Sequence, residues 1–264
     1  MNFLLIYHVD VNLPDLENAA YFPIGGVEAA LMLYRRLKKV KLISDIIIST
    51  SSKTPDKKLY ELFKNDNIEI SKTIATNNLE RITRIAFEHQ ADYVVLVTND
   101  NPLIDIEIID TLIEFCIESK EEYDYAGNMH PESYPAGNKV EIIRTASLSY
   151  GLRYSKFDYE RKYITPFFWD EPDQWNIGNM SIKNDISKKY RYCMEYPEDL
   201  KVINLIYEEL FKASDNVSYT EIVDFLRKNP EINKINERYK GTHWYREHFS
   251  KLKTISGKDT RLMF

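Results

Sequence analysis

Asp100 is the residue of this sequence best placed to do chemistry, because it follows the apolar run 93–97 and precedes a proline-containing turn. A continuous aliphatic run is typical of a central strand in a parallel α/β sheet, and such sheets bind ligands at the carboxyl ends of their strands. The pattern therefore places the Asp100 carboxylate where a metal–phosphate complex would bind. Asn99, Asp100 and Asn101 are also common turn formers ahead of an N-capped helix, so the pattern alone leaves both interpretations open.

Two further features near the N-terminus could take part in binding or catalysis. Gly25-Gly26 precedes a predicted helix and could offer backbone N–H groups to an anion, although a Gly-Gly pair is more often a tight turn. His8 ends the first predicted strand and could act as a base or a metal ligand. A single histidine in that position is more often a hydrogen-bonded structural residue.

The elements that must position these residues alternate regularly over the first 118 residues. Apolar strands and amphipathic helices follow one another, with the period of the hydrophobic pattern switching each time. Repeated βα units of this length predict a doubly wound, mostly parallel sheet with right-handed crossovers. The predicted strands are 2–9, 45–50, 68–71 and one ending near 100, and the predicted helices are 28–39, 56–64, 79–89 and 105–118.

The order of elements becomes less regular after residue 123. Strands are predicted at 139–144 and 190–194, and a helix or turn is predicted at 161–169. Everything after Pro197 has a helical pattern, with amphipathic helices at 199–211 and 220–228. We therefore expect an α/β domain over residues 1–196 and a helical C-terminal extension over residues 197–264.

Composition limits the possible classes of protein. The two cysteines cannot form a disulfide framework, and no apolar run approaches the ~20 residues of a membrane span. With no basic N-terminal region, the chain is expected to be cytoplasmic and to have no membrane partner. The net charge of −6 argues against nucleic acid as a partner.

Several collinear motifs resemble SpsF-type spore coat polysaccharide proteins, which are relatives of the sugar-acid cytidylyltransferases. The segment from Thr98 to Asp105 resembles their Thr-Gly-Asp-Cys-Pro-Leu-Ile-Asp motif. The resemblance implies a nucleotide-diphospho-sugar transferase-like α/β fold of the GT-A type. Weaker matches are Leu79-Glu-Arg81, Tyr134-Pro-Ala-Gly137, Val140-Glu141, Arg161 with Ile164-Thr-Pro-Phe167, Glu195-Tyr-Pro-Glu-Asp-Leu200 and the segment 229–236.

The chemistry implied by the resemblance is attack on the α-phosphorus of CTP with release of pyrophosphate. Two carboxylates would hold Mg²⁺, which prefers oxygen ligands and offsets charge on the phosphoryl oxygens. Asp100 matches the first carboxylate and Glu195 the second, which is aspartate in relatives. Glu195 could instead cap the helix that begins near Pro197. The nucleotide-binding residues expected by this resemblance are Gly25, Gly26, Arg81 and Asn99.

The N-terminal loop departs from the family pattern. Relatives carry a loop rich in glycine and basic residues after the first strand, whereas residues 8–26 contain Asp10, Asp15 and Glu17 and no Lys or Arg. Carboxylates beside a triphosphate cost about 1 kcal/mol per close pair even in water. Lys139 and Arg161 are therefore predicted to supply the missing positive charge, as catalytic residues beside Asp100, or to recognise a phosphate or carboxylate on a different acceptor.

Three classes of function remain open. The first is a cytidylyltransferase-like enzyme that activates a sugar acid or another small acceptor for cell-surface glycan synthesis. The second is a divergent homologue that binds a nucleotide or sugar, or scaffolds a partner, which the acidic loop favours. The third is a glycosyltransferase, because Asn99-Asp100-Asn101 is a weakened Asp-x-Asp motif.

A homodimer is expected, with exposed apolar residues of the C-terminal helices at the contact. The residues expected to form it are Tyr207, Leu210 and Phe225.

Overall fold

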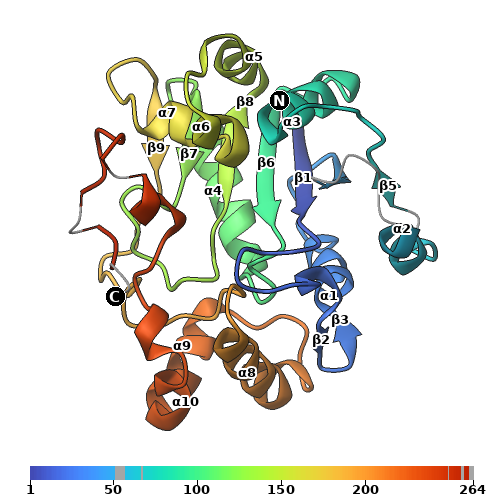
Figure 1. Cartoon of the computed structure of the whole chain (residues 1–264), viewed down its shortest axis with the longest axis vertical. Coiled ribbons are helices and arrows are strands. Elements are labelled where there is room, and N and C mark those ends of the chain that lie inside the picture. Colours follow the sequence, from blue (N-terminus) through green and yellow to red (C-terminus); the bar gives the residue numbers. More distant parts are fainter. Residues whose placement is uncertain (51–56, 67, 249, 257–258, 262–264) are drawn as a thin grey trace.

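A mixed β-sheet forms the centre of the protein in the computed structural model (Figure 1), which describes residues 1–50, 57–66, 68–248, 250–256 and 259–261. In the described residues, only β8 of this sheet runs antiparallel to its neighbours. The predicted doubly wound, mostly parallel sheet is therefore confirmed. The order of its strands is β5 (Glu69–Ile70), β4 (Asp45–Thr50), β1 (Phe3–Val9), β6 (Tyr93–Thr98), β8 (Glu141–Arg144), β7 (Tyr125–Gly127) and β9 (Ile177–Asn179).

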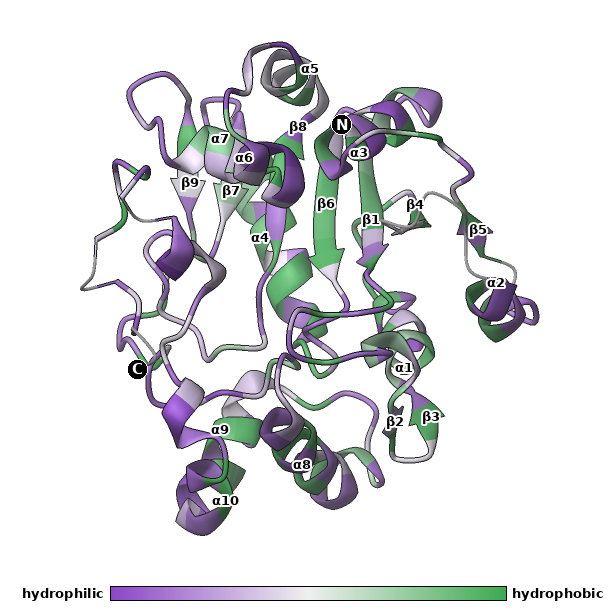
Figure 2. Cartoon of the chain, in the orientation of Figure 1, coloured by the Kyte–Doolittle hydropathy of each residue, from purple (hydrophilic) through white to green (hydrophobic). Residues whose placement is uncertain are grey.

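Helices cover both faces of the sheet because its central strands are apolar on both sides, as the colours of Figure 2 show. In β1, Leu5 and Tyr7 contribute to one hydrophobic cluster, whereas Leu4 and Ile6 contribute to another on the opposite face. The first face is covered by α1 (Ala29–Leu37), α2 (Lys57–Phe63) and α4 (Ile106–Glu118). The second is covered by α3 (Asn78–Glu88), α5 (Thr145–Tyr154), α6 (Asp158–Tyr163) and α7 (Pro166–Trp169).

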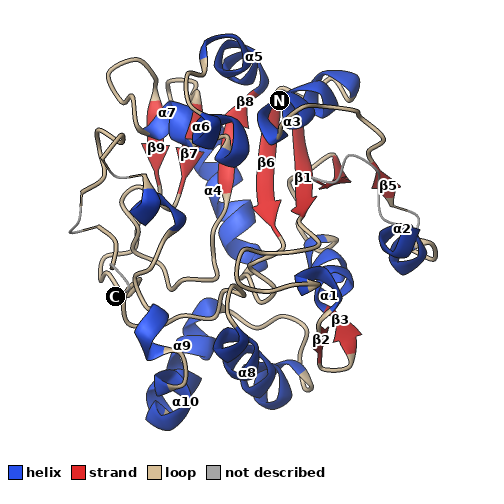
Figure 3. Ribbon diagram, in the orientation of Figure 1, coloured by secondary structure: helices blue, strands red, loops and turns tan. Residues whose placement is uncertain are grey.

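The C-terminal helices form a third cluster beyond the carboxyl ends of the parallel strands (Figure 3). They pack against α1 and a short hairpin formed by β2 (Pro23–Ile24) and β3 (Val27–Glu28). No helix within the described ranges is long and apolar enough to cross a membrane. The helices are α8 (Pro197–Ile206), which continues as a π-helical turn over Tyr207–Phe211, α9 (Tyr219–Lys228) and α10 (Pro230–Lys234).

The predicted elements up to residue 118 match the structure within one or two residues, and the later predictions are less accurate. Residues 190–194 do not form a strand, because only Arg191 makes a bridge, to Ala136. The described residues after 234 are mostly irregular, with short 3₁₀ turns at Glu237–Tyr239 and Trp244–Glu247. The helical pattern in this part of the chain arises from apolar residues that pack individually on the rest of the protein.

The residues expected at a dimer contact also make contacts within the chain. Tyr207, Leu210 and Phe225 are half-buried and pack against the third cluster. The Tyr207 ring also lies so close to Gly25 that a Cβ atom there would clash with it. Because each side chain keeps part of its surface exposed, their place in a subunit interface stays a prediction.

One buried carboxylate fastens the C-terminal helices to the sheet domain. Asp199, in the first turn of α8, is fully buried and accepts five hydrogen bonds. Two come from the guanidinium of Arg191, at 2.9 Å each, and one comes from Asn236 at 2.8 Å. The other two come from the backbone N–H groups of Glu195 and Tyr196. Asp199 therefore joins segments from three parts of the chain.

We predict that Asp199→Ala lowers the free energy of unfolding by about 3–5 kcal/mol, because it removes the buried partner of Arg191 and leaves the half-buried Glu195 as the remaining carboxylate of that arginine. Urea denaturation followed by circular dichroism measures this loss. Asp224→Ala, which removes an exposed i,i+3 pair with Arg227, is the control and changes stability by at most about 0.5 kcal/mol. If Asp199→Ala does not fold, Asp199→Asn serves in its place with a smaller loss. A loss no greater than that of the control would contradict the prediction.

Candidate active site

A cavity lies at the carboxyl end of β6, between the sheet domain and the irregular C-terminal segment. Its walls come from the turn after β6, the loop between β7 and β8, the segment before α8, and residues 242–245. Charged side chains and histidines are concentrated in it. Those that line it are Asp100, His130, Glu132, Lys139, Arg191, Glu195 and His243.

Asp100 is held in place by its neighbours in the turn. Its Oδ1 accepts hydrogen bonds from the Thr98 hydroxyl and from Asn101 Nδ2, the latter at 2.7 Å. Its carbonyl accepts the Met194 N–H at 2.7 Å, which brings the segment before α8 alongside the end of β6. Burial, followed by the negative charge of Glu195, raises the pKa of the Asp100 carboxyl group. The two carboxylates are thus close enough to repel each other.

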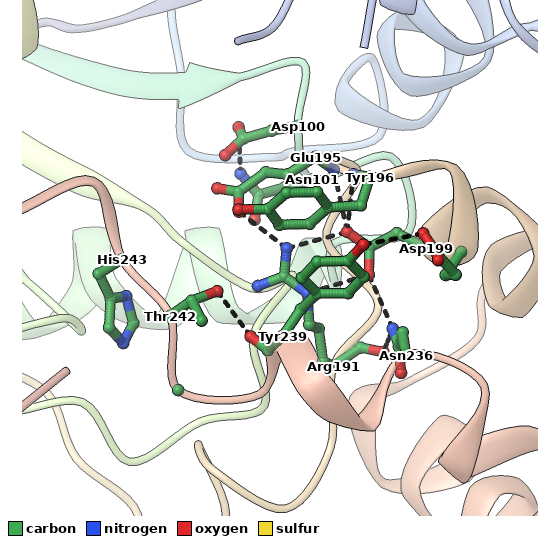
Figure 4. Close-up of polar contacts among 12 residues, drawn as sticks. Asp100, Asn101, Arg191, Glu195, Tyr196, Asp199, Asn236, Tyr239, Thr242 and His243 are labelled. Atoms are coloured by element: carbon green, nitrogen blue, oxygen red, sulfur yellow. Dashed lines mark hydrogen bonds and ion pairs between the residues drawn. The ribbon is translucent and has the colours of Figure 1, made fainter. Parts of the chain in front are cut away.

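Glu195 is oriented by the same arginine that binds Asp199. One guanidinium nitrogen of Arg191 lies 2.7 Å from Glu195 Oε2 and 2.9 Å from Asp199 Oδ2 (Figure 4). Arg191 is almost fully buried, whereas the Glu195 side chain is 34% exposed. The alternative function of capping α8 belongs to Asp199, since it is the Asp199 carboxylate that accepts the Glu195 and Tyr196 N–H groups.

Lys139 enters the cavity opposite Asp100. Its ammonium lies 3.0 Å from Oε2 of the buried Glu141. Burial alone would lower the pKa of Lys139, but the carboxylates of Glu141, Asp100 and Glu195 outweigh it, so this pKa is raised. Lys139 is therefore charged at neutral pH, and most of its charge is already balanced by Glu141.

The donor set fits a hard divalent cation at Asp100 and Glu195. Lys139 pairs with Glu141, and Arg191 pairs with Asp199 as well as Glu195, so the repulsion between Asp100 and Glu195 is only partly offset. No group of three His, Cys, Asp or Glu suited to a metal occurs among the described residues. A cation here would take its other ligands from water and phosphate, as Mg²⁺ commonly does.

The structure does not bring Arg161 into the cavity. Its Nε and one terminal nitrogen donate to the hydroxyl and carbonyl of Ser155, at 3.1 and 3.0 Å, on the outer side of α6. An arginine so engaged contributes no charge beside Asp100. The catalytic role predicted for Arg161 is not supported by this position.

The glycines predicted to bind a nucleotide form the turn of the β2–β3 hairpin. Gly25 and Gly26 have φ angles of 58° and 85°, the left-handed values that such a turn requires. The Gly25 N–H is directed at Asn204 Oδ1, 3.3 Å away on α8, and neither glycine lines the cavity. These residues are therefore in the tight turn that was the alternative interpretation.

Asn99 and Arg81 lie near the loop that follows β1. Asn99 accepts the Asp10 N–H at 3.0 Å and donates to the Asp10 carbonyl at 2.9 Å. Arg81 is buried, and burial lowers its pKa while the nearby Asp10 carboxylate partly offsets this. His8, also buried, has Nδ1 3.3 Å from Ser49 Oγ. Asn99 thus holds the backbone after β1, whereas Arg81 donates to Asn78 Oδ1 and to the Ala75 carbonyl beside the start of α3. None of the three residues lines the cavity.

Four of the charged or histidine residues that line the cavity were not predicted from the sequence: His130, Glu132, Arg191 and His243. The chain contains only five histidines, and this scarcity is the one sequence signal that could have drawn attention to two of them. The half-buried His130 ring stacks on Trp169 with centroids 4.0 Å apart. His243 Nε2 lies 3.2 Å from Glu132 Oε2, which joins the C-terminal segment to the loop after β7.

Comparisons with known proteins agree with the fold and with the motifs. A protein of Methanocaldococcus jannaschii described as uncharacterized is 28% identical over 84% of this chain and 88% of its own length. The spore coat polysaccharide biosynthesis protein SpsF of Bacillus subtilis is 21% identical over 87% of this chain and 96% of its own.

Solved structures show the same fold. A cytidylyltransferase from Leptospira borgpetersenii superposes with a TM-score of 0.82 at 21% identity, covering 89% of this chain and 97% of its own. A CMP:2-keto-3-deoxy-manno-octonic acid synthetase complexed with CTP gives 0.62 at 14% identity, covering 80% of this chain and 100% of its own. The model of the cytidylyltransferase family matches residues 16–236, most of the chain. This protein therefore belongs to the cytidylyltransferase family.

Proposed function

We propose that this protein transfers the cytidylyl group of CTP to a sugar-like acceptor bound in the cavity beside Asp100. The observation that carries the proposal is the half-buried Asp100 carboxylate, which lines the same cavity as Glu195 at the carboxyl edge of the sheet and is close enough for the Glu195 charge to raise its pKa. This arrangement occurs in a chain of the cytidylyltransferase family. A role in cell-surface glycan synthesis is proposed from the name of the Bacillus subtilis relative.

The proposed reaction needs an acceptor oxygen in line with the α-phosphorus of CTP. The new P–O bond forms as the bond to pyrophosphate breaks, and pyrophosphate takes up the proton when the acceptor is a hydroxyl. Mg²⁺ bound at Asp100 and Glu195 would supply Lewis-acid stabilisation of the phosphoryl oxygens. Asn101 donates a hydrogen bond to Asp100, and Arg191 forms an ion pair with Glu195. Lys139 lines the same cavity and carries a positive charge.

The first test is the response of thermal stability to nucleotides. We expect CTP with Mg²⁺ to raise the melting temperature more than UTP, ATP or GTP do, and EDTA to remove the effect. A ligand present at 100 times its Kd stabilises the folded state by about 2.7 kcal/mol. Pyrophosphate release is then measured with a panel of acceptors. If no nucleoside triphosphate changes the melting temperature, the proposal fails.

A second test uses Asp100→Asn, which we expect to raise thermal stability while it lowers enzymatic turnover. Because the folded-state pKa of Asp100 is raised, the ionised carboxylate destabilises the fold above that pKa, and this cost disappears at lower pH. We expect the variant to melt at a higher temperature than wild type at pH 7.5, but not near pH 3.5. We also expect Mg²⁺-dependent turnover to fall roughly a hundredfold or more. An unchanged rate would contradict the assigned role.

A second candidate function is that of a divergent homologue that binds its ligand without turnover. The acidic loop after β1 favours it, because Asp15 is exposed and close enough to Tyr196 to influence that ring's pKa. Tyr196 follows Glu195 directly in the chain. A homodimer also stays a prediction, which analytical ultracentrifugation would test.

The charge of this loop gives a third test. We expect Asp15→Asn with Glu17→Gln to tighten CTP binding severalfold at low ionic strength, with the gain shrinking at high salt. Isothermal titration calorimetry at two salt concentrations measures both effects. Glu118→Gln, at the exposed end of α4, is the matched control for net charge. Equal affinities for the double variant and wild type at low salt would show that the loop lies away from the triphosphate.

A further inference from the structure

The part of the cavity between the loop after β7 and the C-terminal segment has its own set of polar groups. Glu132 comes from this loop and His243 from the C-terminal segment, and both line the cavity with only 13% and 11% of their side chains exposed. The Nε2 atom of His243 has no hydrogen-bond partner within the described residues, although Glu132 Oε2 is 3.2 Å away. A ligand could therefore satisfy a buried polar atom here.

Aromatic rings hold the histidines of this region in fixed orientations. The His243 ring stacks on Tyr245 with centroids 4.7 Å apart, and the His130 ring stacks on Trp169. Burial, with Lys139 and His243 nearby, holds the pKa of His130 well below its usual value, so this ring is neutral at neutral pH. A neutral imidazole binds hydroxyl groups well but offers no charge to a carboxylate.

The lysine and the arginine that line the cavity are already paired with carboxylates. Lys139 pairs with Glu141, and Arg191 pairs with Asp199 and Glu195. In the described part of the chain, the ion pair of Glu132 is with His243 and not with a lysine or arginine. A carboxylate brought beside Glu132 would thus meet a like charge, and the Lys139 and Arg191 side chains are already paired with carboxylates.

We infer that the acceptor presents an uncharged, polyhydroxylated sugar ring to this region, bound through its hydroxyl groups by Glu132 and His243, and that sugar acids are rejected here. This inference rests on the proposed function for the identity of the cavity as the acceptor site. A sugar hydroxyl donates to the Glu132 carboxylate, and another interacts with His243 Nε2. The specificity-determining residue is Glu132, since its charge is what excludes an acid.

The test measures sugar binding without nucleotide, by saturation-transfer NMR. The probes are three matched pairs of methyl glycosides, in the gluco, manno and galacto series. In each pair one member is the neutral sugar, and the other is the uronate, in which a carboxylate replaces the CH₂OH group. We expect at least one neutral sugar to bind, and its uronate to bind roughly tenfold more weakly or not at all.

The Glu132→Gln variant tests whether Glu132 causes this discrimination. Glutamine retains the shape and the acceptor oxygen but removes the charge, so the uronate should gain affinity relative to its neutral partner. Glu118→Gln should leave the ratio unchanged, and melting curves confirm that both variants fold.

Failure of this inference can be told apart from failure of the proposed function. Preferential binding of uronates, a ratio indifferent to Glu132→Gln, or no binding of any probe would each overturn the assignment of this region. The response to CTP and Mg²⁺ is measured independently, so a nucleotide-specific shift would leave the proposed function standing in those cases.

Discussion

The ion pair between Arg191 and Asp199 determines how the two parts of this protein are joined. Both groups are buried, and burying a charge is unfavourable unless it is paired and hydrogen-bonded. Asp199 meets that requirement by accepting bonds from Arg191, Asn236 and two backbone N–H groups. These partners come from the segment before α8 and from the C-terminal segment, so α8 cannot separate from either segment without breaking buried, charge-assisted hydrogen bonds.

The same pair also sets the geometry of the candidate active site. Arg191 uses one nitrogen for both Asp199 and Glu195, which fixes the position of the Glu195 carboxylate in the cavity that Asp100 also lines. Asp100 is in turn fixed by the turn that ends β6. The result is two nearby carboxylates whose mutual repulsion is tolerated because the fold is stabilised elsewhere. Strained electrostatics of this kind are common where a protein binds a cation.

The cations of the cavity are bound to carboxylates, which changes how a nucleotide would be accommodated. In a site with free lysines and arginines, the triphosphate charge is balanced by the protein. Here Lys139 is shared with Glu141, Arg161 is hydrogen-bonded to Ser155, and the loop after β1 is acidic. Under the proposed function, most of the charge that neutralises the triphosphate would therefore come from a metal ion bound with the nucleotide.

The sequence determined the alternating strands and helices and the position of Asp100 at the end of β6, because both depend on the spacing of neighbouring residues. The collinear motifs also indicated the family. The contacts of individual side chains were decided only by the tertiary structure. Arg161 donates to Ser155, and the Tyr207 ring packs against Gly25. The contact between Glu132 and His243 joins residues far apart in the chain. No local pattern encodes such pairs, because they arise from the way whole segments pack.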